Sequence, residues 1–189
     1  STLSHTSSFF NERIKNPLDF SFMKIHSKVS VLQSSTRFGI VVLGSVDGKV
    51  RIKSLEDGKK IATVTLDEGQ VPTKILITES WGFIVVYGIS RMYVLSINGK
   101  MIKKCDTIPP FRKWFTFRTN DDFDYVGFLD KKEKSLSYFE VMYPEKIISD
   151  SCMKFHTIED IVSIHFDAMQ NYFLILTRNG KISFLPFQS

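Results

Sequence analysis

Apolar and polar positions alternate along much of this chain, and elsewhere apolar residues run in bursts bounded by Gly, Asp, Asn and Ser. Residues 38–55, FGIVVLGSVDGKVRIKSL, show the pattern best. An apolar run ends at Gly44, the tetrapeptide VDGK follows, and near-alternation resumes at Val50. Asp-Gly between two such runs is a strong hairpin signal, because Gly accepts the positive φ that a type I′ turn requires. The pattern therefore predicts short antiparallel strands joined by tight turns.

This unit repeats. Gly39 and Gly82 lie 43 residues apart, and a shift of about this size places residues 38–59 on WGFIVVYGISRMYVLSINGK at 81–100, whose hairpin is two residues shorter. Both copies contain an aromatic residue followed by Gly, then a β-branched run, and both end in Gly-Lys. Two further copies occupy residues 170–187, with the turn NGK, and residues 122–144, with the degenerate turn DKKEKS.

A short apolar stretch precedes each copy, and another follows all but the last, which gives about four strands in a period near 40–45 residues. A four-stranded antiparallel sheet buries neither face well alone, whereas radial stacking gives each sheet a neighbour. A β-sandwich or barrel would also contain regular short strands. The Gly-Lys turns, kept in register across copies, favour an all-β propeller segment of about four four-stranded antiparallel blades, part of a larger propeller.

The repeat also predicts the organisation of the chain. Residues 1–28 are expected to be a linker or the last strand of a preceding blade. The chain begins at Ser1 in mid-pattern, which indicates a piece of a longer protein. One blade each is expected at 29–70, at 71–110, at 111–154 (the degenerate copy) and at 155–189, the last without a following apolar stretch.

Composition agrees with a folded domain. The chain has 189 residues, of which 43% are hydrophobic and 24% charged, enough for a sizeable core. Its 17 Phe favour strands that pack on another layer. The net charge of +5 is unevenly spread: residues 71–118 hold eight Lys/Arg and two Asp/Glu, and residues 119–189 hold seven and eleven. The middle of the chain is expected to form a basic surface and the last third an acidic one.

The cellular setting is expected to be cytoplasmic. Cys105 and Cys152 lie far apart without CxxC or His spacing, which fits a reducing compartment. No apolar stretch approaches the roughly 20 residues of a membrane span, and the start has no signal-peptide pattern.

No catalytic, cofactor or metal motif emerges. GSVDGKV (44–50) has three residues between its glycines where a phosphate-binding loop needs four, and Val50 replaces its Ser or Thr. No GxSxG elbow is present, and Cys105, despite nearby lysines, is expected to pack as a small apolar residue. In NDDFDYVG (120–127), Asp122 and Asp124 match alternate calcium ligands, but Val and Gly follow. The four histidines lack ligand spacing. The sequence predicts no enzyme, no cofactor and no bound metal.

Residues 100–118, KMIKKCDTIPPFRKWFTFR, interleave basic and aromatic side chains. Such a patch can bind single-stranded nucleic acid or an anionic membrane surface. Strand alternation instead puts Phe115 and Phe117 on one face and Trp114 on the other, so the aromatics are expected in the core and the basic groups in solvent. Nucleic acid is therefore not an expected partner. The candidate interaction patch consists of Lys103, Lys104, Arg112, Lys113 and Arg118.

KILITESWGFIVVY (74–87), followed by MYVLSINGKMI (92–102), resembles the degenerate WD-repeat propeller at the carboxyl end of BEACH-domain proteins, the beige and neurobeachin group. Residues 124–147 and 173–187 are also similar to blades of that region. The likeness, which covers residues 30–188, makes the segment WD-repeat-like. The WD dipeptide itself is missing, with Lys53-Ser54 and Leu95-Ser96 in its place, as is the Gly-His signature. No BEACH domain lies in this chain.

The resemblance implies a large cytosolic scaffold in vesicle and membrane traffic, whose propeller docks other proteins and which associates peripherally with membranes through the full-length protein. It supplies no catalytic residues. One alternative is a WD-repeat-like propeller scaffold of another complex, in RNA processing or a vesicle coat. Another is a propeller enzyme, which requires acids or histidines from several blades near the central channel. The acids cluster instead in loops such as 121–124, so a non-catalytic protein–protein interaction scaffold is expected.

Overall fold

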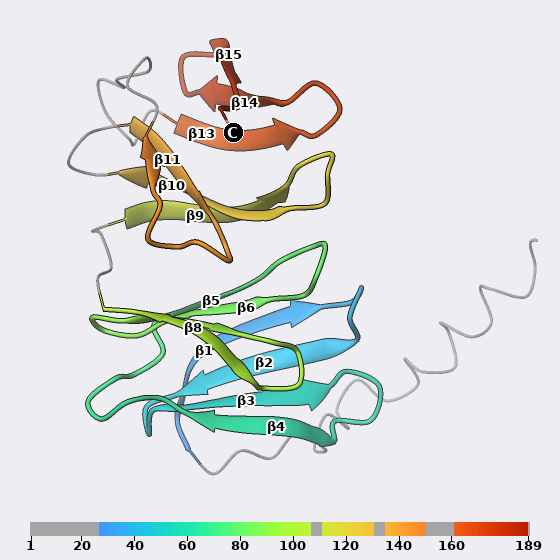
Figure 1. Cartoon of the computed structure of the whole chain (residues 1–189), viewed down its shortest axis with the longest axis vertical. Helices are drawn as coiled ribbons and strands as arrows, with labels where there is room; N and C mark the ends of the chain where they lie inside the picture. Colours follow the sequence, from blue (N-terminus) through green and yellow to red (C-terminus); the bar gives the residue numbers. More distant parts are fainter. Residues whose placement is uncertain (1–26, 107–110, 131–134, 150–160, 189) are drawn as a thin grey trace, which may run out of the picture.

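The computed structural model describes residues 27–106, 111–130, 135–149 and 161–188, and every regular element among them is a β-strand (Figure 1). The strands form four antiparallel sheets. The first contains β1 (Val29–Ser35), β2 (Ile40–Ser45), β3 (Lys49–Ser54) and β4 (Lys60–Thr65). The second contains β5 (Lys74–Ile77), β6 (Ile84–Tyr87), β7 (Met92–Leu95) and β8 (Met101–Cys105). The third contains β9 (Phe111–Arg118), β10 (Asp124–Asp130), β11 (Ser135–Glu140) and β12 (Ile148–Ser149). The fourth contains β13 (Ile161–Asp167), β14 (Tyr172–Thr177) and β15 (Ile182–Pro186).

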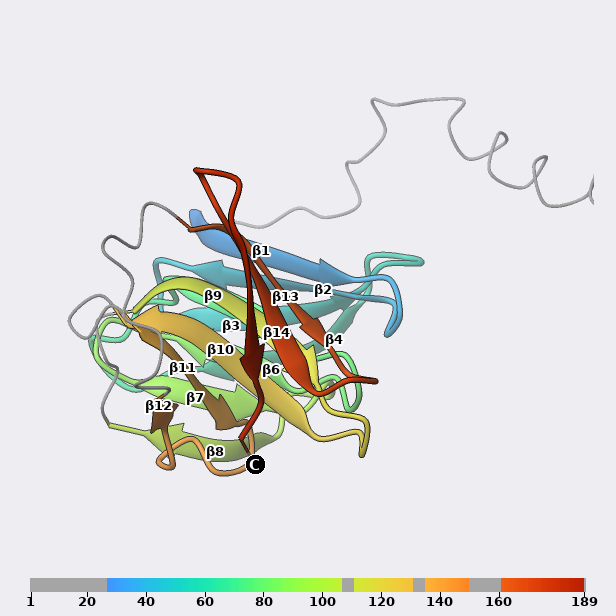
Figure 2. The same ribbon diagram turned by 90° about the horizontal axis from the view of Figure 1, so that it is seen from above.

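Within each sheet the strands lie side by side in chain order, as a series of hairpins requires. The sheets follow one another in chain order along the longest axis of the molecule (Figure 1). Contacts join β1 to β5 and β5 to β9, so the first strands of successive sheets lie together. Figure 2 shows the strands of the fourth sheet turned relative to those of the first, as in successive blades. The predicted all-β fold of stacked antiparallel blades is confirmed. The expected DKKEKS turn and residues 1–26 lie outside the described residues.

One turn recurs with the pattern Ser/Thr-x-Asp/Asn-Gly-Lys. In residues 45–49, Gly48 donates its backbone N–H to the Ser45 carbonyl at 3.0 Å, and the Ser45 hydroxyl donates to the Asp47 carboxylate at 2.6 Å. The same arrangement closes residues 96–100 and 177–181, again with Gly at positive φ. The expected type I′ turn is wrong in detail. Only Gly48 has positive φ, so residues 46–48 form a three-residue loop closed by a left-handed Gly.

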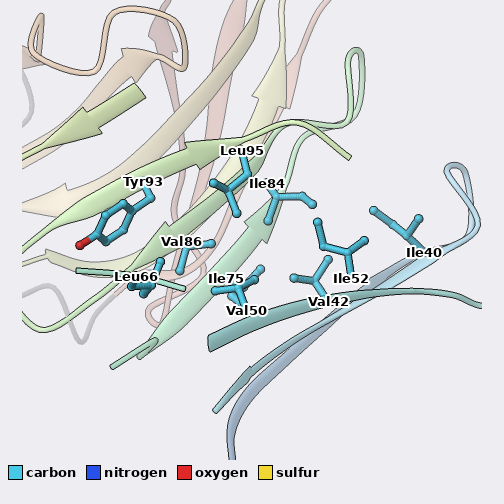
Figure 3. Close-up of a cluster of buried hydrophobic side chains, with 10 residues drawn as sticks. All are labelled: Ile40, Val42, Val50, Ile52, Leu66, Ile75, Ile84, Val86, Tyr93 and Leu95. Carbon is cyan, nitrogen blue, oxygen red and sulfur yellow. The ribbon is translucent and has the colours of Figure 1, made fainter. Parts of the chain in front are cut away.

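On the central strands of the second and third sheets, side chains of alternate residues pack on opposite neighbouring sheets. Ile84 and Val86 of β6 face the first sheet, in the cluster drawn in Figure 3, whereas Val85 and Tyr87 face the third. In the third sheet, Phe128 packs back on the second sheet, in the cluster that contains Val85 and Tyr87. The next cluster joins the third sheet to the fourth. These three apolar layers stabilise the stack, since strand alternation gives each inner sheet two buried faces.

The fourth sheet exposes the face whose equivalent in the first sheet is buried against the second sheet. Val50 and Ile52 follow the turn at Gly48 and are fully buried against the second sheet. Ile182 and Phe184 follow the equivalent turn at Gly180, yet they are 57% and 64% exposed. Within the described residues, the fourth sheet therefore presents to solvent the face with which the first sheet contacts its successor.

No described segment forms a helix of the length and hydrophobicity that a bilayer span requires.

Candidate interaction face

The four turns between the first and second strands of the sheets all lie at one end of the stack, on the right in Figure 1. We call this end the turn face; its turns are residues 36–39, 78–83, 119–123 and 168–171. Each turn contains a residue at positive φ, which is Gly in the first two and a non-Gly residue in the others. Asp and Asn tolerate this conformation better than other side chains. The four residues are Gly39 (61°), Gly82 (70°), Asp122 (61°) and Asn171 (55°).

A buried carboxylate ties the second sheet to the third at this face. Asp124, at the start of β10, is 3% exposed. It accepts the Thr78 hydroxyl at 2.6 Å and the backbone N–H groups of Ser80 and Trp81 at 3.0 and 2.9 Å. The Thr78 hydroxyl in turn accepts the Phe83 N–H at 2.9 Å. This network satisfies the charge without a cation and fixes the turn 78–83 against the neighbouring sheet.

Trp81 is held at the surface of the turn face. Its side chain is 66% exposed, and its indole N–H donates to the Asp122 carbonyl at 3.0 Å. Phe123, the next residue after Asp122, is 51% exposed. Trp81-Gly82, the aromatic-Gly pair that marks the second copy of the repeat, therefore forms a turn with Trp81 at the rim. The turn face thus carries two large exposed aromatic side chains, Trp81 in the turn of the second sheet and Phe123 in the turn of the third.

A pocket of about 260 Å³ opens at the turn face between the third and fourth sheets. We call it the acidic pocket, because the described residues that line it include two carboxylates and no basic side chain. Its lining comes from the turn 119–123, the facing ends of β10 and β11, the turn before β14 and the segment after β15. The lining residues are Thr119, Asn120, Asp121, Phe123, Tyr125, Glu140, Asn171 and Phe187.

The acidic pocket is partly desolvated where Glu140 and Tyr125 meet. Glu140 is half-buried and lies opposite Tyr125 in the β10–β11 register. Burial raises the pKa of Tyr125, and the Glu140 carboxylate adds to this effect. Thr119 is 8% exposed, and its hydroxyl has no hydrogen-bond partner. The pocket therefore combines negative charge with an unused polar group.

A second pocket, of about 400 Å³, lies nearer the first strands. Polar residues from the end of β1 and from the turns 36–39 and 78–83 line most of it. Among the described residues that line it, Glu79 and Arg37 are charged, and their charges are opposite.

The five residues of the basic patch lie on two strands. Lys103 and Lys104 are on β8, the last strand of the second sheet, whereas Arg112, Lys113 and Arg118 are on β9, the first strand of the third. Most of the described side chains have partners within the protein. Lys104 pairs with Asp67 at 2.8 Å, Arg118 pairs with Asp122 at 3.2 Å, Lys103 lies over the Tyr143 ring, and Lys113 donates to the Ile161 carbonyl.

The aromatic residues of that segment pack as alternation predicted. Trp114 packs on Tyr87 with ring centroids 3.8 Å apart, towards the second sheet. Phe115 and Phe117 face the fourth sheet. Burial raises the pKa of the neighbouring Cys105 thiol, the opposite of the activation that nearby lysines would give. Cys152 lies outside the described residues.

Metal ligation finds no support in the described part of the chain. Asp124, one of the two calcium candidates, is committed to the turn 78–83, and Asp122 pairs with Arg118. The described residues contain no group of three or more His, Cys, Asp or Glu side chains placed to hold a metal.

Sequence reasoning missed the acidic pocket and the role of Asp124. The sequence held a local signal only for the turns. Asp122 and Asn171 occupy the positions of Gly39 and Gly82 in the earlier copies, and all four have positive φ. The pocket residues come from separate repeats and follow no spacing along the chain.

No protein-family model matches the chain, and no curated protein matches it in sequence. Solved structures match in fold. They include the complex of the fission yeast SREBP–SCAP binding domains (13% identity, TM-score 0.57), covering 87% of this chain and 50% of that one. The β-propeller domain of Myceliophteria thermophila Cps50 (Swd1) matches at 12% identity with a TM-score of 0.56, covering 100% and 57%. The computationally designed Ika4 protein matches at 13% identity with a TM-score of 0.52, covering 87% and 94%.

The chain thus spans about half of the two natural structures and nearly all of the designed one. At these identities the matches show the fold alone. Four antiparallel sheets of three or four strands, stacked in chain order, match part of WD40 propellers. The chain has a WD40-like β-propeller fold.

Proposed function

We propose that this chain is a non-catalytic protein-interaction module that binds other proteins through its turn face. The observation that carries the proposal is Trp81, which is two-thirds exposed but has its indole N–H bonded and its backbone fixed by Asp124. An exposed aromatic side chain that is already ordered loses little conformational entropy on binding and makes a strong contact residue. Phe123, which is 51% exposed in the next turn of the same face, adds a second exposed aromatic side chain.

The structural matches support this class of function. One of the matching propellers was solved as the complex of the fission yeast SREBP–SCAP binding domains.

The finer proposal is that the module belongs to a BEACH-type scaffold in vesicle and membrane traffic, acting in the cytoplasm with peripheral membrane association through the full-length protein. The resemblance of residues 74–102 to that group supports it. A propeller scaffold of an RNA-processing or coat complex is the alternative, and the identity of the captured proteins separates the two. Lys103, Lys104 and Arg118 are engaged within the protein, which supports a protein partner over nucleic acid.

The test is quantitative capture from an extract of cells that express the protein. The immobilised chain is compared with the double variant Trp81→Ala/Phe123→Ala, and captured proteins are measured by mass spectrometry. We expect the double variant to lose a defined set of proteins at least about tenfold, as removal of two central aromatic contacts does. Phe184→Ala is the matched control, because this side chain is as exposed as Trp81 but lies away from the turn face. Equal capture by the wild type and the double variant would refute the proposal.

A further inference from the structure

We propose that the acidic pocket binds the guanidinium group of an arginine side chain presented by a partner protein. The inference rests on the proposed function of the turn face and adds the chemistry of one contact. Four features carry it: the size of the pocket, its charge, its unused hydroxyl and its aromatic walls.

The size selects a single side chain. The volume of about 260 Å³ lies near the lower end of the roughly 300–1,000 Å³ typical of small-molecule pockets, so one long amino-acid side chain suits it. The surrounding turn face leaves room for the backbone that carries this side chain.

The negative charge of the acidic pocket favours a cationic ligand. Asp121 and Glu140 line the pocket, and neither is in an ion pair in the described part of the chain. Arg118 is the nearest cation along the chain, but it is paired with Asp122 at 3.2 Å and does not line the pocket. Two unpaired carboxylates in a partly desolvated recess attract a positive group and repel an anion.

The hydroxyl of Thr119 is an independent sign of a missing partner. It is buried and has no hydrogen-bond partner, although buried polar groups in folded proteins nearly always have one. Thr119 lines the same pocket as the two carboxylates, with its hydroxyl oxygen covered from solvent. A guanidinium carries five N–H donors, so it can serve a carboxylate and, after rotation of the Thr119 side chain, this hydroxyl oxygen as well.

The aromatic walls favour arginine over lysine. The rings of Tyr125 and Phe187 meet edge to face with centroids 5.2 Å apart, and Phe123 adds a third ring to the lining. A planar guanidinium stacks on such rings and is less strongly hydrated than an ammonium group. It also matches a carboxylate with two parallel hydrogen bonds.

The test uses three capped pentapeptides that differ only in the central residue, which is arginine, citrulline or lysine. Each is titrated into the ¹⁵N-labelled chain, and amide chemical shifts are followed. We expect the arginine peptide to shift the amides of Thr119, Tyr125, Glu140 and Phe187. The uncharged citrulline peptide should bind at least about tenfold more weakly, the loss expected when charge-assisted hydrogen bonds become neutral ones.

Variants of the chain locate the contact. Glu140→Gln should weaken binding of the arginine peptide by about tenfold, since it removes the half-buried charge. Thr119→Val should weaken binding severalfold without loss of stability, because it removes an unsatisfied hydroxyl and keeps the shape. This variant therefore remains informative if Glu140→Gln fails to fold. Glu68→Gln is the matched control, an exposed carboxylate on the link between the first two sheets, and it should change nothing.

Three results would overturn the inference: equal binding of the arginine and citrulline peptides, equal binding of the arginine and lysine peptides, or no shifts around the pocket at millimolar peptide. Any of these would leave the proposed function intact if Trp81→Ala/Phe123→Ala still lost its captured proteins. If that double variant lost none, the proposed function would fail while the peptide titration could still succeed.

Discussion

Asp124 accepts the backbone N–H of Trp81 at 2.9 Å across 43 positions of the chain, the same spacing that separates Gly39 from Gly82. The bond joins the turn of one sheet to the start of the second strand in the next. With the bonds from Ser80 and Thr78, it makes one carboxylate the acceptor for three groups of the preceding sheet. The exposed position of Trp81 is thus set by the neighbouring sheet.

Asp124→Ala is expected to lower the free energy of unfolding by about 3 kcal/mol, because it leaves two backbone N–H groups and a hydroxyl without their acceptor. Asp124→Asn should cost less, about 1–2 kcal/mol, since the amide keeps one acceptor oxygen. Equilibrium unfolding in urea measures both. The control is Asp122→Asn, whose carboxylate makes a partly exposed ion pair with Arg118 and should cost less than about 1 kcal/mol. Equal, small losses for Asp124→Ala and Asp124→Asn would contradict this account.

Gly39 and Gly82 give a matched pair of turn substitutions. Both have positive φ, so alanine introduces backbone strain at either site of about 1–2 kcal/mol. A Cβ at Gly39 would meet no atom within 4 Å, whereas one at Gly82 would lie 2.9 Å from Ile97 Cγ2 and 3.1 Å from the Phe38 ring. Gly82→Ala is therefore expected to destabilise the chain more than Gly39→Ala. The difference between the urea midpoints of the two variants reports the cost of the contacts that the new Cβ makes at position 82. Equal midpoints would show that Ile97 and Phe38 move aside at little cost.

Strands and turns were predictable because their signals are local. Alternation located the strands of all four sheets, and the Gly at positions 39 and 82 marked turns that need positive φ. The turn type at Asp47-Gly48 was wrong, because the dipeptide also fits a three-residue loop in which only Gly48 is left-handed. Local sequence does not separate the two loops.

The candidate site was not predictable, because its residues meet only when sheets stack. Asp124 looked like a calcium ligand or a solvated loop residue, and only the packing of β10 beside the turn 78–83 reveals its partners. Thr119, Glu140 and Phe187 reach one pocket from three different elements. Conversely, the basic patch was conspicuous in the sequence as one segment, yet its residues lie on strands of two different sheets.

The interactions of the Asp67 carboxylate allow us to predict how the free energy of unfolding changes at acid pH. Its carboxylate accepts the Tyr93 hydroxyl at 2.7 Å and pairs with Lys104 at 2.8 Å and Arg91 at 3.1 Å. The bond from Lys104, followed by that from Tyr93, lowers the pKa of Asp67 from 3.8 to about 2. A lowered pKa in the folded state means that the stabilisation is present above pH 3.8 and is lost as pH falls towards 2.

Asp67→Asn is therefore expected to be less stable than the wild type near neutral pH, and the gap should narrow between pH 4 and pH 2. Urea unfolding at a series of pH values measures this gap. Glu68→Gln, at the adjacent exposed position, is the control: its free energy of unfolding should change with pH as that of the wild type does. A gap that stays constant down to pH 2 would show that the charge of Asp67 contributes nothing to stability.

Phe173 and Phe184 test which faces of the fourth sheet are covered. Phe173 is fully buried and packs on Phe117 and Phe166 with ring centroids 5.0 and 4.9 Å away, whereas Phe184 is 64% exposed on the other face. Phe173→Ala is expected to lower the free energy of unfolding by about 3–5 kcal/mol, because it removes a ring from a packed aromatic cluster. Phe184→Ala should change it by less than about 1 kcal/mol, since a largely exposed ring has little burial to lose. A comparable loss for both variants would mean that the face carrying Ile182 and Phe184 is covered in solution, as the equivalent face of the first sheet is covered by the second.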